Sequence, residues 1–212
     1  MKKLFFLVFF CALSSAEVKW SDANECVLPD NSIFINKIIN KMTLEQKVGQ
    51  IIMPEINNIT PQDAKKYHFG TILNGGGGFP NQNKNSKIND WKKLSESYYD
   101  ASTEVDGTRI PILWGTDAVH GHNNVIGATI FPHNIGLGAT RNIELIESIG
   151  QAVAKEVVST GIIWTFAPTI AVPRNDTWGR TYEGFSENTD LVSKLGQSFI
   201  EGLQGEDKEF LD

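Results

Sequence analysis

The sequence is poor in cysteine. It contains two, Cys11 and Cys26, and Cys11 falls in an apolar N-terminal stretch that we expect to be removed. The remaining Cys26 has no second cysteine to pair with, so an internal disulfide is excluded. Export of a chain without a disulfide fits a bacterial periplasm or secretion.

The chain also lacks an excess of positive charge and an apolar run long enough to span a bilayer. A net charge of −6 without any basic stripe argues against a nucleic-acid partner. The apolar run at residues 4–13 falls short of the roughly 20 residues of a transmembrane helix. It follows two lysines and precedes small residues, which is the pattern of a secretory signal peptide. We expect residues 1–16 to be removed after Ala16, leaving a periplasmic or secreted protein without a stable membrane anchor.

A phosphate-binding loop is absent as well. The glycine run Gly75–Gly78 follows an apolar run, but no Lys-Ser/Thr pair comes after it and its spacing does not match a dinucleotide fingerprint. We therefore expect a turn at the rim of a site, and no cofactor.

What the sequence does contain is an alternation of apolar runs and helical patterns. The apolar runs predict four strands, at residues 51–53, 71–73, 110–114 and 162–167. Alternation of this kind indicates a parallel sheet with crossover helices, and near-continuous apolar strands indicate that both faces are covered. Four such units fit a small open sheet or half of a TIM-like barrel, and periodicity leaves both open. Residues 17–35 show little periodicity and are expected to form an N-terminal arm.

Several helix ends are marked by residues with a clear physical role. Thr43 and Gln46 have the spacing of a capping box, and Pro61 suits the first position of a helix. Asn142 can cap a further helix that Gly161 ends. Apolar residues at helical spacing predict the last helix face: Leu191, Leu195, Phe199 and Leu203.

Polar residues follow the third and fourth predicted strands. Asp117 has the position of a carboxylate that accepts hydrogen bonds from two sugar hydroxyls, but also of a loop cap bonded to backbone amides. Arg180 offers a planar donor fork for hydroxyls or carboxylates, or an ion pair with Glu183 or Glu187. Because carboxyl ends of parallel strands share one edge, we expect these residues to lie on a common face.

Three histidines raise the question of a metal. His120, His122 and His133 contain a His-x-His pair with a third histidine further along, as in some zinc sites. The segment between them is rich in glycine, and the spacing gives no sign that they converge. Hydrogen-bonding loop histidines are the default interpretation, and no metal is expected.

Long motifs in a fixed order resemble glycoside hydrolase family 3, in its β-glucosidase and glucan exohydrolase branch. They occupy residues 43–50, 115–124, 128–138 and 178–187. The resemblance implies an α/β fold, a TIM-like (β/α)8 barrel of which residues 36–212 supply about the first four units. It also implies a retaining exo-hydrolase that removes glucose from a β-glucoside or β-glucan oligosaccharide.

The resemblance also assigns roles to residues. Asp117 and Arg180 match the family's substrate-binding residues, with Glu183, His120 and His122 in support. The family's nucleophilic Asp and acid/base Glu have no counterpart here, so we expect an N-terminal fragment that lacks a C-terminal half. Spacing alone would also allow Asp117 and Glu183 to act as the two catalytic carboxyl groups of a glycosidase. The alternatives are a non-catalytic sugar-binding half-barrel and a β-N-acetylglucosaminidase of the same family.

Overall fold

The computed structural model describes residues 31–104 and 108–205, which divide into two compact units at residue 40. The predicted signal peptide lies outside the described residues. In the first unit, helix α1 (Ser32–Ile39) begins at Ser32, so residues 32–35 of the predicted arm are helical. No helix among the described residues has the length and apolar character needed to cross a membrane.

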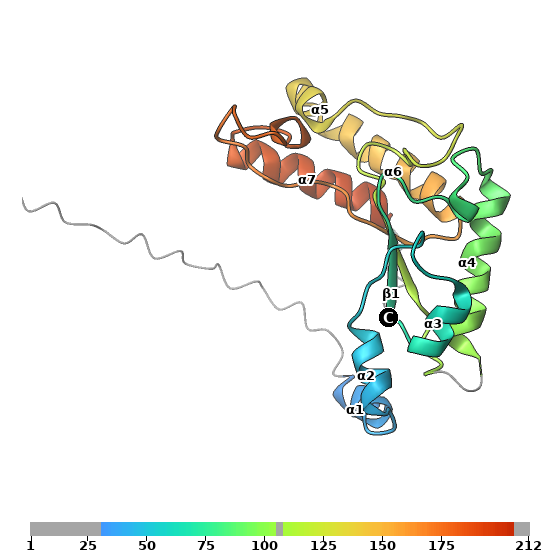
Figure 1. The fold of residues 1–212 in the computed structure, drawn as a ribbon. Helices are drawn as coiled ribbons and strands as arrows, with labels where there is room; N and C mark the ends of the chain where they lie inside the picture. Colours follow the sequence, from blue (N-terminus) through green and yellow to red (C-terminus); the bar gives the residue numbers. More distant parts are fainter. Residues whose placement is uncertain (1–30, 105–107, 206–212) are drawn as a thin grey trace, which may run out of the picture. The chain divides into compact units, whose positions relative to one another are not determined.

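The second unit is an α/β arrangement around a three-stranded parallel sheet (Figure 1). The strands are β1 (Thr71–Asn74), β2 (Leu113–Thr116) and β3 (Trp164–Thr165), in the order β1-β2-β3. The α-helices are α2 (Leu44–Gln50), α3 (Pro61–Tyr67), α4 (Ile88–Thr103), α5 (Asn134–Thr140), α6 (Ile143–Ser159) and α7 (Thr189–Gln204). Two 3-10 turns complete the unit: η1 (Pro80–Gln82) and η2 (Thr181–Glu183).

The first predicted strand, at residues 51–53, is wrong. The amides of Ile51 and Ile52 donate to the carbonyls of Val48 and Gly49, so the end of α2 uses these backbone groups. Parallel pairing with β1 starts a few residues later, as an isolated bridge between Glu55 and Leu73. The structure therefore shows three strands and a bridge, consistent with part of a barrel, in place of four complete β/α units.

The other strands form close to their predicted positions. β1 matches the prediction, whereas β2 begins at Leu113, because Pro111 has no amide and the Ile112 amide donates to Ser102 Oγ at 3.0 Å. β3 retains only Trp164 and Thr165 of its predicted range.

The two faces of the sheet differ in what covers them. Ile72 pairs with Trp114, and both are buried. Tyr98 of α4 packs edge-on against Trp114, with ring centroids 5.7 Å apart. Ile72 therefore shares with Trp114 the face of the sheet that α4 covers, and the partly exposed Leu113 points to the opposite face.

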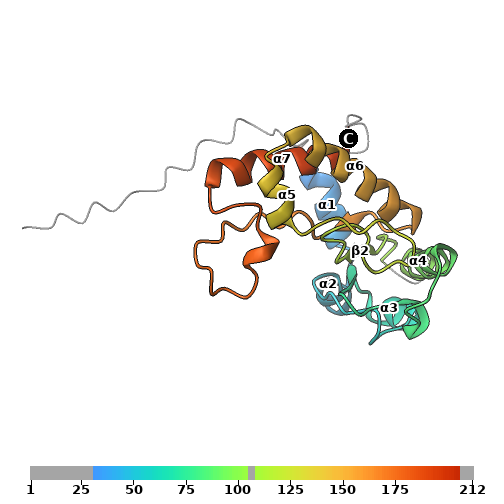
Figure 2. The ribbon, with the colours of Figure 1, turned by 90° about the horizontal axis from the view of Figure 1, so that it is seen from above.

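The predicted helix starts are confirmed. Thr43 and Gln46 form a complete capping box, Thr60 and Asp63 form another before Pro61, and the Asn142 side chain accepts from the Leu145 amide. Helices α6 and α7 lie side by side, and α5 lies next to α7 and η2 (Figure 2).

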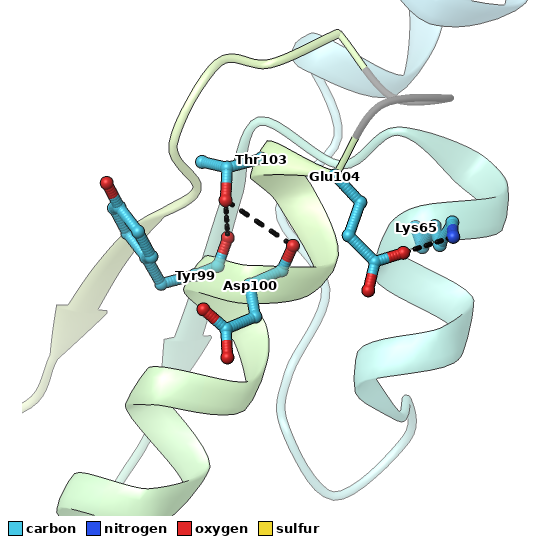
Figure 3. A network of polar contacts seen from close by, with 5 residues as sticks. All are labelled: Lys65, Tyr99, Asp100, Thr103 and Glu104. Atoms are coloured by element: carbon cyan, nitrogen blue, oxygen red, sulfur yellow. Dashed lines mark hydrogen bonds and ion pairs between the residues drawn. The ribbon is translucent and has the colours of Figure 1, made fainter.

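Helix α3 is tied to the C-terminal end of α4 (Figure 3). Lys65 forms an ion pair with Glu104, the residue that ends α4. The Thr103 hydroxyl donates to the Tyr99 carbonyl at 2.8 Å within the last turn. This ion pair joins the two helices at the protein surface.

Candidate functional site

A small polar pocket lies beyond the carboxyl ends of β2 and β3. Its volume is ≈ 220 Å³, and it is lined by Asp117, Val119, His120, His133, Asn134, Thr169, Tyr182 and Glu183. These residues come from the segments after β2 and β3, from the start of α5 and from η2. In open parallel sheets this edge is where ligands bind. The structure thus brings together Asp117, His120 and Glu183, three of the five residues predicted for the site.

Asp117 is placed to meet a ligand. Its amide donates to the Asn74 carbonyl at 3.1 Å, which continues the β1–β2 ladder by one step. Its side chain is half-buried, and no described residue donates a hydrogen bond to its carboxylate. The geometry therefore gives no support to the alternative in which Asp117 caps its own loop.

Arg180 is held by Glu183 in a two-bond fork. Its Nε donates to Oε1 at 2.8 Å, and its second terminal nitrogen donates to Oε2 at 2.6 Å. These bonds raise the pKa of Arg180, and the charge of Asp117 also contributes in the same direction. The Arg180 side chain is 65% exposed, so its remaining donors are available to a ligand.

Glu183 is ill suited to donate a proton. The hydrogen bonds from Arg180 lower its pKa more than its burial raises it. A general acid needs a raised pKa. The interpretation of Glu183 as a brace for Arg180 fits the structure, whereas its pairing with Asp117 for acid catalysis does not.

His120 stabilises the loop that carries Asp117. Its Nδ1 contacts the Phe131 carbonyl at 3.1 Å, and because a carbonyl only accepts, Nδ1 carries the proton. The Phe131 amide donates back to the His120 carbonyl at 2.9 Å. The His120 ring also lines the pocket.

His122 lies in the core and does not line this pocket. Its side chain is fully buried, with ring centroids 5.9 Å from Trp91. The Thr160 hydroxyl donates to the Val157 carbonyl at 2.5 Å, so it accepts from His122 Nε2 at 3.1 Å. Burial lowers the pKa of His122 to about 4, against a smaller opposite effect of Glu156. The neutral His122 imidazole thus links the loop that carries Asp117 to the end of α6 through its hydrogen bond to Thr160.

Sequence reasoning missed part of the pocket wall. The His133 ring lies 4.3 Å from the ring of His120 and 4.7 Å from that of Tyr182, centroid to centroid. Asn134 and Thr169 complete the wall. The motif at residues 128–138 contains His133 and Asn134, but its sequence does not indicate that they line a pocket.

The histidines do not form a metal site in the described residues. His120 and His133 stack, whereas His122 bonds to Thr160 in the core. Among residues 31–104 and 108–205, no group of three His, Cys, Asp or Glu side chains is arranged to hold a metal ion.

These features define the class of protein: an α/β protein with a small polar pocket at the carboxyl edge of its parallel sheet. A family model, the glycosyl hydrolase family 3 N terminal domain, matches residues 43–209. The chain belongs to glycoside hydrolase family 3.

Two curated relatives with β-glucosidase names match most of the described chain. The chain is 32% identical over 191 residues to the lysosomal beta glucosidase of Dictyostelium discoideum, covering 84% of this chain and 23% of that protein. It is 28% identical over 177 residues to the periplasmic beta-glucosidase of Salmonella typhimurium, covering 81% and 21% respectively. The chain thus spans less than a quarter of the length of these relatives.

Solved structures agree with this family and fold. The exo-1,3/1,4-beta-glucanase of a Pseudoalteromonas species has 52% sequence identity and a TM-score of 0.78, over 84% of this chain and 22% of that one. A family 3 beta-N-acetylglucosaminidase of a Paenibacillus species has 25% identity and a TM-score of 0.63, over 77% and 31%.

Proposed function

We propose that this chain supplies the glucose-binding side of a β-glucosidase-type exo-hydrolase. The enzyme removes glucose from the non-reducing ends of β-glucosides or β-glucans. The observation that carries this proposal is the pairing of Asp117, whose carboxylate has no hydrogen-bond donor among the described residues, with the forked Arg180 beyond neighbouring strands. An acceptor and a set of fixed donors on one edge match the hydroxyls of one sugar ring.

The catalytic carboxylates come from elsewhere in a longer polypeptide in this proposal. A retaining glycosidase needs a nucleophile and an acid/base about 5 Å apart. Glu183 is occupied by Arg180 and has a lowered pKa, which disqualifies it as the acid. Relatives of which the matched part of this chain covers only 23% and 21% leave room for both carboxylates and for the rest of the barrel.

The location of the enzyme is proposed from the N-terminal residues. The charged, apolar and small-residue pattern of residues 1–16 supports export to the periplasm or the medium. The named periplasmic relative is consistent with the same location.

Two alternatives make different predictions. A β-N-acetylglucosaminidase of the same family is supported by a solved structure at 25% identity, against 52% for the glucanase. A non-catalytic sugar-binding half-barrel predicts binding of glucose without hydrolysis. Rates on p-nitrophenyl β-glucoside and p-nitrophenyl N-acetyl-β-glucosaminide distinguish all three.

Asp117→Ala in the complete enzyme tests the proposed role of the site. Loss of hydroxyl contacts that strengthen towards the transition state should lower kcat/KM by roughly 100-fold or more. Asp100→Ala, which removes an exposed carboxylate on α4, is the matched control and should leave kcat/KM unchanged. Equal kinetics for both variants would refute the assignment.

A further inference from the structure

Asp117 and Arg180 belong to separate loops, yet both must face one sugar. Asp117 follows β2, and Arg180 precedes η2. The first turn of α5 touches both loops. Its contacts carry an inference that rests on the proposed function and goes one step beyond it.

Toward Arg180, the contact runs through a buried amide. Asn134 is 5% exposed, and its Nδ2 donates to the backbone carbonyl of Glu183 at 2.9 Å. The Glu183 carboxylate in turn holds Arg180 through two bonds. Asn134 therefore fixes the backbone of the residue that orients the arginine.

Close backbone packing reinforces this contact. A Cβ added to Gly138 of α5 would lie 1.8 Å from the carbonyl oxygen of Phe185. Only glycine permits this approach, so the helix and the segment after η2 are in direct backbone contact. The turn that carries Arg180 cannot shift along α5 without breaking this packing.

Toward Asp117, the contact runs through stacked rings. His133 precedes the first residue of α5 and packs between His120 and Tyr182. His120 is bonded in both directions to Phe131, which closes the loop that starts at Asp117.

We propose that His133 and Asn134 are positioning residues that set Asp117 and Arg180 at a fixed separation. Groups that bind a transition state must be held within about 0.5 Å of the productive geometry. Binding several hydroxyls of one sugar requires that Asp117 and Arg180 both be held in this way. The start of α5 contacts both of the loops that carry them. These residues act through Arg180 and Asp117 and make no step of the reaction themselves.

A double-mutant cycle in the complete enzyme tests this proposal, with p-nitrophenyl β-glucoside as the substrate. Asn134→Ala should lower kcat/KM roughly 10-fold in the wild-type background. In an Arg180→Lys background the same change should cost less than about 3-fold, because the geometry it protects is already lost. Likewise, His133→Ala should lower kcat/KM roughly 10-fold in the wild-type background and less than about 3-fold in an Asp117→Ala background.

Asn142→Ala is the matched control. Asn142 is the N-cap of α6, and its removal weakens a helix away from the pocket. Its effect on kcat/KM should be small and equal in both backgrounds. If Asn134→Ala does not fold, Asn134→Asp keeps the shape of the side chain and removes the donor.

The outcomes separate the two proposals. If Asn134→Ala lowers kcat/KM by the same factor in both backgrounds, Asn134 is merely structural and the positioning role is overturned. If Arg180→Lys and Asp117→Ala do not themselves lower kcat/KM, the proposed function is refuted, and the positioning role that rests on it is refuted as well.

Discussion

Arg180 is hydrogen-bonded to Glu183 through two of its nitrogens, and the rest of its guanidinium is exposed to solvent. Its Nε and one terminal nitrogen bond to Glu183, while its side chain remains 65% exposed. A ligand therefore meets an arginine whose orientation is already set, which lowers the entropy lost on binding. This arrangement depends on the planar fork and not on the positive charge alone.

Arg180→Lys should be poorly tolerated for this reason. A lysine keeps the charge but cannot form two parallel bonds to Glu183 and bind a hydroxyl as well. We expect kcat/KM on an aryl β-glucoside to fall by roughly 10- to 100-fold in the complete enzyme. Lys194→Arg, on the exposed side of α7, is the control for the reverse exchange. Wild-type KM and kcat in the lysine variant would make Arg180 peripheral.

His122 predicts a pH dependence of stability. Its pKa falls from 6.5 in the unfolded chain to about 4 in the folded one, so the unfolded state binds the proton more readily between these values. The stability that the neutral, buried His122 contributes is therefore present above pH 6.5 and is lost as the pH falls toward 4. The loss contributed by His122 should be about 2 kcal/mol between about pH 7 and pH 5.

His122→Gln removes the titrating group and should flatten this part of the curve. The free energy of unfolding, measured by urea denaturation at the two ends of this pH range, checks the difference between variant and wild type. Identical pH dependence in the two proteins would show that His122 is accessible to protons in the folded state.

At the scale of elements, the helix starts follow from local rules, whereas one of the four predicted strands does not form. Thr43, Thr60 and Asn142 cap helices as their side chains predict, because capping is a contact within one turn. Ile51 and Ile52 have the pattern of a strand but end a helix, since strand pairing depends on a partner far away in the sequence.

Helix α5 illustrates the same limit within the site. Its sequence holds Gly136 and Gly138, which disfavour a helix, yet Gly138 is required by its close approach to Phe185. Asp117, Arg180 and Glu183 were found from motifs, whereas the places of Asn134 and Tyr182 depend on packing between elements. His122 was assigned to the site because it belongs to the same motif as Asp117, and the sequence does not reveal on which side of a loop a residue lies.

Asn142→Ala should cost stability and not activity. The Asn142 side chain accepts from the Leu145 amide at 3.0 Å, and loss of such a cap costs about 1 kcal/mol. A shift of the urea midpoint with unchanged kcat/KM is expected. An unchanged midpoint would mean that the first turn of α6 is held by its packing alone.

At the scale of the whole molecule, one face of the sheet lacks cover in the described residues. Leu73, Leu113, Trp164 and Phe166 are only half-buried. The edge of β3 opposite β2 has no neighbouring strand in the described part of the chain. Exposed apolar surface and bare strand edges promote association.

Residues 17–212 expressed alone should therefore associate or aggregate, and should not hydrolyse p-nitrophenyl β-glucoside. Size-exclusion chromatography and a rate measured against a mock-purified control check the two parts. A folded monomer would contradict the first part. Hydrolysis above the control would contradict the second and return Asp117 and Glu183 to consideration as a catalytic pair.

The most direct test of glucose binding by Asp117 and Arg180 is a crystal structure of the complete enzyme with glucose bound. We predict that both Asp117 carboxylate oxygens accept hydrogen bonds from glucose hydroxyls at the usual O–H···O distance of about 2.7 Å. We also predict that Arg180 donates to the same sugar while keeping both bonds to Glu183. Glucose bound elsewhere, with the Asp117 carboxylate turned toward backbone amides, would contradict both assignments.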